Sequence, residues 1–443
     1  MPEHRDANYQ HCLSHSRSML KIAIWHNLPS GGGKRALYDQ VRGLTSRGHY
    51  IEAWCPPTAS QNFLPLNALI KEHIVPLADF PVAPKNWIGR CKHRAGETAQ
   101  RMKAMEKHCQ RCAEEISAGG FDLLLVHPCL FFRASPIANY SRLPNVLYLQ
   151  EPYRALYEAW PQLPWAAPQR EYRPFSPHYW SQLARELLNL HGKRVQVREE
   201  LAWVKSYDQI LVNSLFSRET LLRTYNLDSR VCYLGIDTEN FYPTGAAKEP
   251  FVIGLGNIDF NKRPLLAIQT IGAISAGDRP KLVWVGNYAE PDYLEILKKE
   301  ADKLGVDFAF KVLIPDKELH DLLSRAAVMI YTSHLEPFGY APLEANACGT
   351  GVVAIAEGGV REAVGNPASG ILVSNSDPEE LAIALLKFTS NPGFAAEFGR
   401  KARTYVQEHW SQAKAMDRLE AEMERLLKTP RGKANQHSHK QAS

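Results

Sequence analysis

The segment at residues 334–364 holds the side chains whose types and spacing most clearly indicate chemistry. Glu336 and Glu344 are eight positions apart, and Gly339 lies between them. The segment follows directly on the apolar run at 328–331, which is typical of a buried strand. Ligands of α/β proteins bind outside the carboxyl ends of parallel strands. We therefore expect Glu336 in a strand-to-helix loop and Glu344 in the first turns of the following helix, both at the rim of a crevice.

Two carboxylates at such a rim suit a ligand rich in hydroxyl groups, because a carboxylate accepts hydrogen bonds from hydroxyls. Gly339 lets the backbone approach an anion such as a phosphate closely. The residues alone leave a second interpretation open, in which Glu344 only complements the helix dipole and Glu336 is solvated.

The same segment, HLEPFGYAPLEANACGTGVVAIAEGGVREAV, resembles the signature of family 4 retaining glycosyltransferases of the GT-B fold, in which two glutamates flank seven residues. The resemblance implies that Glu336 contacts the hydroxyls of the donor sugar at the catalytic centre and that Glu344 contacts the nucleotide ribose. It also implies that the backbone of Gly339, Tyr340 and Ala341, next to Phe338, completes the donor site.

Three further blocks resemble the family in the expected order, namely NSLFSRETL, VCYLGID and GNIDFNKRP. The resemblance is weak over residues 21–243 and strong from 251 to about 374. Lys262, in the last block, matches the lysine that holds the donor diphosphate, where its charge would stabilise the leaving group. The family usually has an arginine five residues earlier, but this chain has Asn257. Arg263 is a candidate substitute.

In the first half of the chain, the loop with Gly31, Gly32 and Gly33 is similar to the family's glycine loop, which faces the diphosphate and the acceptor across the interdomain cleft. A glycine-rich turn that merely closes an ordinary βαβ unit is the alternative. Gln150 stands where many relatives have histidine, so it can bind a sugar hydroxyl but cannot take a proton. His127 is either a cleft residue or a structural histidine after a strand.

The candidate site residues can meet only if the strands that precede them lie side by side in a sheet. The pattern of apolar residues predicts two such sheets. Apolar runs alternate with helical patterns, which predicts parallel sheets covered on both faces. The runs occupy residues 21–25, 50–54, 122–126, 146–149 and 209–212 in the first half, and 251–255, 281–285, 328–331 and 351–355 in the second. We predict an α/β protein of the GT-B type, with two Rossmann-like, doubly wound parallel-sheet domains that face an interdomain cleft.

The predicted domain organisation divides the 443 residues, which exceed the size of one ordinary core. A polar leader, an acceptor domain, a donor domain, a helix that crosses back to the first domain and a disordered tail follow one another. Their ranges are 1–20, 21–243, 251–408, 409–428 and 429–443.

Composition excludes several classes of protein. Hydrophobic residues make up 45% and charged residues 22%, too apolar for a disordered chain, and the net charge of +5 is no signature of nucleic-acid binding. Eight scattered cysteines favour a reducing, cytoplasmic compartment. Cys109 and Cys112 have the spacing of metal or redox pairs, with surface cysteines of structural role as the alternative. We expect no signal peptide and no transmembrane helix.

The segment at 85–111 carries eight basic residues and two glutamates, with Trp87, Ile88, Met102 and Met105 among them. It is a candidate for peripheral association with the inner membrane face, suited to a lipid-linked acceptor, or else a solvated helix face. The chain has no D-x-D motif, so we expect no metal at the donor diphosphate and no cofactor.

Together these patterns predict a retaining hexosyltransferase that moves a sugar from a nucleoside-diphosphate donor, with UDP or GDP, to the hydroxyl of a glycan, a lipid-linked glycan or a small molecule. A non-catalytic sugar-nucleotide binding protein is one alternative. Another enzyme of this architecture, such as an epimerase or a phosphorylase, is a second.

Overall fold

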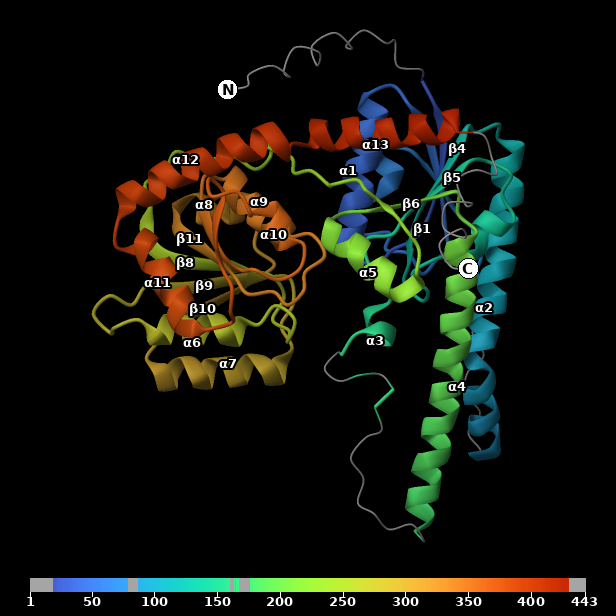
Figure 1. Cartoon of the computed structure of the whole chain (residues 1–443), viewed down its shortest axis with the longest axis horizontal. Helices are drawn as coiled ribbons and strands as arrows, with labels where there is room; N and C mark the ends of the chain where they lie inside the picture. Colours follow the sequence, from blue (N-terminus) through green and yellow to red (C-terminus); the bar gives the residue numbers. More distant parts are fainter. Residues whose placement is uncertain (1–18, 79–86, 160–162, 164, 167–175, 430–443) are drawn as a thin grey trace, which may run out of the picture.

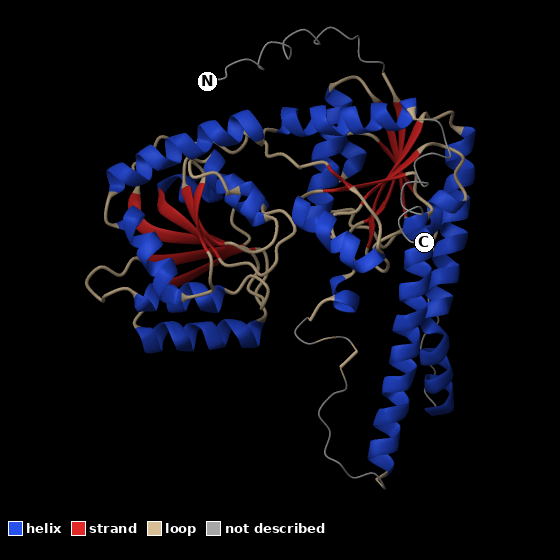
Figure 2. Ribbon diagram, viewed as in Figure 1, coloured by secondary structure: helices blue, strands red, loops and turns tan. Residues whose placement is uncertain are grey.

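The computed structural model describes residues 19–78, 87–159, 163, 165–166 and 176–429, with side chains described from residue 96 onward in the helix that begins at 87. Two separate parallel sheets, each covered by helices on both faces, form two lobes (Figure 1, Figure 2). The prediction of two doubly wound parallel-sheet domains is therefore confirmed.

The N-terminal sheet has the strand order β3-β2-β1-β4-β5-β6-β7. Its strands are β1 (Lys21–Asn27), β2 (Tyr50–Cys55), β3 (Lys71–Ile74), β4 (Leu123–Cys129), β5 (Asn145–Tyr148), β6 (Gln209–Val212) and β7 (Arg230–Val231). Its helices are α1 (Gly32–Ser46), α2 (Trp87–Ala118), α3 (Arg154–Tyr157), α4 (Pro177–Lys205) and α5 (Leu215–Tyr225), with 3₁₀ turns at Leu66–Ala68 and Pro136–Asn139.

The C-terminal sheet has the strand order β10-β9-β8-β11-β12-β13. Its strands are β8 (Glu249–Leu255), β9 (Lys281–Gly286), β10 (Phe308–Val312), β11 (Ala326–Tyr331), β12 (Gly351–Ile355) and β13 (Gly370–Val373). The helices around and after it are α6 (Pro264–Ala273), α7 (Pro291–Leu304), α8 (Asp316–Arg325), α9 (Tyr340–Ala347), α10 (Val360–Ala363), α11 (Pro378–Thr389), α12 (Pro392–His409) and α13 (Gln412–Lys428).

The central strands are apolar on both faces because each face packs against helices. In β1, Ile22 and Ile24 belong to the core under α1 and α13, whereas Ala23 and Trp25 belong to the core under α2 and α4. This alternation follows from the twofold period of side chains along a strand. It explains why β1 is a continuous apolar run in the sequence rather than an alternating one.

Helices α2 and α4 pack side by side and extend well beyond the N-terminal sheet (Figure 1). Met102 and Met105 are buried in the domain core, so they are not available to a membrane surface. Trp87 and Ile88 lie outside the described side chains. Cys109 and Cys112 are also fully buried, so the interpretation of this pair as surface cysteines was wrong. In the described part of the chain, no helix is long and apolar enough to cross a membrane.

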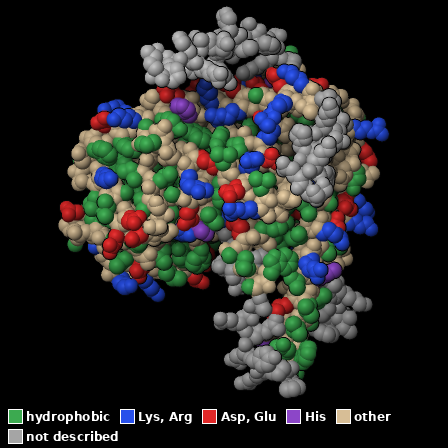
Figure 3. All heavy atoms as spheres, viewed as in Figure 1, with side chains coloured by type: hydrophobic (Ala, Val, Ile, Leu, Met, Phe, Trp, Pro, Cys, Tyr) green, Lys and Arg blue, Asp and Glu red, His purple; other side chains and the backbone are tan. Residues whose placement is uncertain are grey.

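The chain crosses between the lobes twice. After β7 it enters the C-terminal lobe, and after α12 it returns, so that α13 lies across the N-terminal lobe next to α1 (Figure 1). The two crossings run side by side, since Ile236 and Ser411 form a parallel bridge. Arg47 holds α13 in place through Asp417 and Glu420, at 2.9 and 2.6 Å. Acidic and basic side chains are interspersed over both lobes on the face that Figure 3 shows.

Candidate active site

A cavity of about 580 Å³ lies between the two lobes, where the carboxyl ends of both sheets meet. The residues that line it from the N-terminal lobe lie at the end of β4 or follow β1, β4, β5, β6 and β7, and those from the C-terminal lobe follow β8 and β11. The loops after parallel strands converge here, as they do at the ligand sites of other doubly wound folds. The cavity therefore has walls from both domains.

Lys262 and Glu336 form an ion pair in the wall that the C-terminal lobe contributes, with 2.6 Å between Lys262 Nζ and Glu336 Oε2. Their side chains are 25% and 26% exposed, so both are accessible from the cavity. Burial by itself lowers the pKa of Lys262, but the neighbouring Tyr331 and Glu336 outweigh this effect and the net pKa lies above the ordinary lysine value. Lys262 is thus a cation at neutral pH.

The loop after β8 fixes the position of Lys262. Asp259 Oδ1 accepts hydrogen bonds from the backbone N–H groups of Asn261 and Lys262, at 2.9 and 3.0 Å. Thr332, which follows β11, donates to the carbonyl oxygen of Lys262 at 2.7 Å. A Cβ atom at Gly256 would lie 3.1 Å from the Lys262 side chain, so glycine leaves the space that this side chain crosses. Both strands at the centre of the sheet thereby hold the cation.

Arg263 and Asn257 do not line the cavity. Arg263 binds Glu357 at 3.1 Å and contacts His334, which does line the cavity. Asn257 accepts a hydrogen bond from the backbone N–H of Asn287 at 3.2 Å. Arg263 therefore stabilises the wall of the cavity from behind, and the described structure brings only Lys262 of these three residues to its surface.

Glu344 is buried in α9, where it forms an ion pair with Arg35 from α1 of the other lobe. The guanidinium of Arg35 also lies over the rings of Phe241 and Tyr340, at 5.3 and 5.4 Å from the ring centroids. Phe338, Gly339 and Tyr340 line the cavity, whereas Glu344 and Ala341 do not. The sequence pattern did not predict the pairing of Glu344 with Arg35.

Gly32 and Gly33, at the start of α1, line the cavity together with Gln150, and Gly31 does not. A Cβ atom at Gly33 would lie 3.2 Å from Leu28 and 3.6 Å from the Gln150 amide oxygen. The missing side chain thus lets the loop pack directly against Gln150 and leaves its backbone facing the cavity.

His127 is fully buried and does not line the cavity. Its ring stacks on Tyr148, with 5.7 Å between the ring centroids. Burial lowers the pKa of His127 to about 3, and the nearby His26 and Lys34 add to this effect. The structure places His127 in the interior of the N-terminal lobe rather than in the cleft.

Several cavity residues were not singled out in the sequence. Arg133 follows β4 and forms an ion pair with Glu151 at 3.1 Å, and both line the cavity together with Tyr153 and Arg154. Burial raises the pKa of Glu151, although the charges of Arg133 and Arg154 oppose the shift. The position of Glu151 directly after Gln150 was the signal that could have identified it.

Polar contacts near the cavity join the two lobes. Glu362 of α10 accepts hydrogen bonds from the backbone N–H groups of Leu215 and Phe216 at the start of α5, at 2.7 and 3.0 Å. Ser214 donates to the carbonyl oxygen of Pro337, which lines the cavity, at 2.6 Å. The N-terminus of α5 is therefore anchored on the C-terminal lobe.

Comparison with known proteins finds relatives that match about half of this chain. Residues 237–405 match the model of the family described as glycosyl transferases group 1. A D-inositol 3-phosphate glycosyltransferase of Streptosporangium roseum is 38% identical over 216 residues, which cover 43% of this chain and 49% of the relative. A human protein, alpha-1,3/1,6-mannosyltransferase ALG2, is 27% identical over 263 residues, which cover 52% and 62% of the two chains. The chain spans about half the length of the curated relatives it matches.

Solved structures resemble nearly the whole chain. Sucrose-phosphate synthase from Thermosynechococcus elongatus superimposes with a TM-score of 0.67 at 17% identity, covering 92% of this chain and 99% of that one. Anabaena HepE, in complex with UDP and glucose, gives a TM-score of 0.63 at 18% identity, covering 91% and 99%. At these identities the likeness shows the fold. The chain has the GT-B fold, and its residues 237–405 match the glycosyl transferases group 1 family.

Proposed function

We propose that this protein transfers a glycosyl unit from a nucleoside-diphosphate sugar to a hydroxyl acceptor, with retention of configuration. The observation that carries the proposal is the Lys262–Glu336 pair in the wall of the interdomain cavity. The cation is suited to the diphosphate and the carboxylate to the sugar hydroxyls. Both groups lie within a few ångströms of each other, as a single sugar diphosphate requires.

In the proposed reaction, the bond between the anomeric carbon and the diphosphate oxygen breaks while the acceptor hydroxyl bonds to the same carbon from the same face. The acceptor proton goes to the departing diphosphate, and Lys262 stabilises the negative charge that develops there. Gln150 lines the cavity opposite the donor lobe and can hydrogen-bond the acceptor without taking its proton. Catalysis then depends on positioning and on charge stabilisation.

We assign Glu344 to the nucleotide ribose as part of this proposal. Its Oε1 atom is paired with Arg35, so a ribose hydroxyl would bind the second carboxylate oxygen or displace the arginine. Donor binding at Glu344 is therefore coupled to a contact between the two lobes. Gly339 and Tyr340, which line the cavity, are assigned to the donor as well.

The names of the relatives support a hexosyltransferase class, because they include an inositol phosphate glycosyltransferase and a mannosyltransferase. UDP or GDP is the nucleoside diphosphate we expect in the donor. A membrane surface is not part of the proposal, since the buried Met102 and Met105 belong to the protein core. We propose that no metal is needed at the diphosphate, because Lys262 supplies a positive charge there.

The experiment that tests the proposal is a panel of UDP-, GDP- and ADP-sugars, screened first by thermal shift and then for release of nucleoside diphosphate. A donor at about 100 times its dissociation constant adds about 2.7 kcal/mol, which corresponds to roughly 3 °C for a chain of this size. We expect one donor to stabilise the protein and to be turned over at equal rates with and without added Mg²⁺ or Mn²⁺. Stabilisation without any turnover in the presence of acceptors would instead favour a non-catalytic binding protein.

A further inference from the structure

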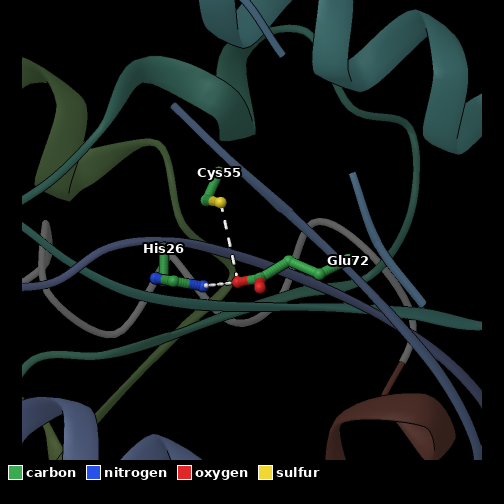
Figure 4. A group of neighbouring side chains, drawn as sticks. All are labelled: His26, Cys55 and Glu72. Carbon is green, nitrogen blue, oxygen red and sulfur yellow. Dashed lines mark hydrogen bonds and ion pairs between the residues drawn. The ribbon is translucent and has the colours of Figure 1, made fainter. Parts of the chain in front are cut away.

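Three side chains with metal-binding atoms converge from the neighbouring strands β1, β2 and β3, and none of the three lines the interdomain cavity. They are His26, Cys55 and Glu72, and Figure 4 shows the imidazole and the thiol directed at the same carboxylate. The parallel register places Ala53 opposite both Ile24 and Glu72, so the twofold alternation puts all three side chains on the face covered by α1. The sheet itself thus brings them together.

The distances within this cluster are close to those of a coordination sphere. His26 Nε2 lies 3.0 Å and Cys55 Sγ 3.6 Å from Glu72 Oε1, and the three ligand atoms all lie within 4.8 Å of one another. A tetrahedral zinc ion with ligands at about 2.0–2.3 Å holds neighbouring ligand atoms about 3.3–3.8 Å apart. Small side-chain adjustments would therefore let one ion contact all three groups.

Several buried nitrogen atoms in this lobe, two of them in or beside the cluster, have no hydrogen-bond partner. Among the described residues, His26 Nδ1, Lys34 Nζ and both ring nitrogens of His127 are buried and have no hydrogen-bond partner. Lys34 and His127 are fully buried, and Lys34 Nζ lies 3.9 Å from Glu72 Oε1. A buried polar atom without a partner costs about 1–3 kcal/mol, and an ion or a water at the site is a common explanation.

We propose that His26, Cys55 and Glu72 form a binding site for a divalent transition-metal ion of the zinc class. A set of one nitrogen, one sulfur and one carboxylate ligand suits zinc and disfavours Mg²⁺ or Ca²⁺, which prefer oxygen ligands. Cys55 releases its thiol proton to solvent on binding, so the ion, the thiolate and the carboxylate together are neutral. The fourth position goes to water.

Lys34 lowers the affinity of the site for a metal ion, because its ammonium and the ion compete for the Glu72 carboxylate. It is also what links the site to the rest of the molecule, since Lys34 directly follows Gly33, which lines the interdomain cavity. An ion at Glu72 would displace the ammonium and shift the first turn of α1. This proposal is independent of the proposed transfer reaction, because its test measures metal and not activity.

The test uses the full-length chain and two metals as probes. The protein is equilibrated with Zn²⁺, separated by gel filtration and analysed for bound zinc by mass spectrometry; in parallel, Co²⁺ is added and the near-ultraviolet absorption of a cobalt–thiolate bond is recorded. We expect Cys55→Ser to bind one zinc fewer than the wild type and to lack the cobalt band. Glu72→Gln should bind zinc at least about a hundredfold more weakly than the wild type. The loss of a residue that only hydrogen-bonds a metal ligand typically weakens binding by less than this.

The matched control is Cys232→Ser, which changes another buried cysteine of the same lobe and should keep both signals. The comparison with Cys55→Ser also corrects for metal bound by histidines elsewhere in the sequence, such as His437 and His439. If Cys55→Ser does not fold, the cobalt–thiolate band still tests the proposal, which requires the band in both the wild type and Cys232→Ser. No band in the wild type, or equal zinc in the wild type and a folded Cys55→Ser, would overturn the proposal and leave buried water as the partner of these groups.

Discussion

The Lys262–Glu336 ion pair makes a specific prediction about nucleoside diphosphate binding. Replacing Lys262 with methionine removes the cation and also leaves Glu336 unpaired at the position we assign to the diphosphate. The lost charge-assisted contact is worth about 1.5–3 kcal/mol. A phosphate oxygen bound to the same ammonium would lie about 4.5 Å from the Glu336 carboxylate, given ordinary hydrogen-bond lengths.

The repulsion between these two anions opposes binding in the wild type and in Lys262→Met alike, and only a change at Glu336 removes it. At about 4.5 Å and an effective dielectric constant of about 20 it amounts to roughly 4 kcal/mol, and the quarter exposure of both side chains reduces it to about 2 kcal/mol. The wild type contains the same repulsion, so Lys262→Met should weaken binding of the free nucleoside diphosphate by the lost contact alone, about 1.5–3 kcal/mol or roughly ten- to a hundredfold. The double variant Lys262→Met/Glu336→Gln should recover about 2 kcal/mol, or roughly thirtyfold.

The assay is isothermal titration calorimetry with UDP or GDP, whichever stabilises the wild type, combined with turnover of the corresponding donor. Glu336→Gln alone should bind the diphosphate as tightly as the wild type or more tightly, because it frees Lys262, while its turnover falls. The control Lys298→Met breaks a solvent-exposed pair with Glu295 and should change neither quantity. If the double variant binds as weakly as Lys262→Met, the repulsion argument is wrong.

Two further predictions concern the contact between α1 and the C-terminal lobe. Arg35→Met leaves the buried carboxylate of Glu344 unpaired and should lower the free energy of unfolding by about 3–5 kcal/mol in urea titrations. The double variant Arg35→Met/Glu344→Gln should restore most of this free energy. A loss no larger than that of an exposed ion pair would contradict the burial argument. Burial raises the pKa of Asp39 from 3.8 to about 6, so the folded protein favours the protonated carboxyl. The free energy of unfolding is therefore highest below about pH 4 and falls by about 3 kcal/mol as the pH rises through 6. Asp39→Asn should accordingly gain up to about 3 kcal/mol over the wild type between pH 4 and pH 8, and an equal difference at both pH values would refute the assigned shift.

The sequence predicted the central strands of both sheets because a strand covered on both faces is a continuous apolar run. It did not predict β3 (KEHI) or β10 (FAFKV), which lie at sheet edges and are only partly buried. The long helix α4 was also missed, since its polar and apolar residues alternate without a clear stripe and its sequence begins inside a proline-rich region. Edge strands and projecting helices carry little of the pattern that core burial imposes.

The candidate site was predictable to the extent that it depends on strand ends. Lys262, Glu336 and Gln150 reach one cavity because each follows a central strand, and the order of strands in a doubly wound sheet fixes where those ends lie. The pairing of Glu344 with Arg35, 309 positions apart, depends on how the two lobes meet, and no local pattern records that. His127 proved to be buried for a different reason, since the sequence of its strand alone does not show which face of the sheet α1 covers.

The helix α13 has a consequence for the order in which this chain can fold during synthesis. The N-terminal lobe has its complete sheet once β7 has emerged from the ribosome, but the apolar side of α1, with Val41 and Leu44, packs in the same core as Met416 and Leu419 of α13. At about 5–20 residues per second, the roughly 200 residues between β7 and the end of α13 take about 10–40 s to appear. For that time the first domain is a discontinuous unit that lacks one of its covering helices. Emergence of α13, rather than completion of the first sheet, is then the event that closes the N-terminal core.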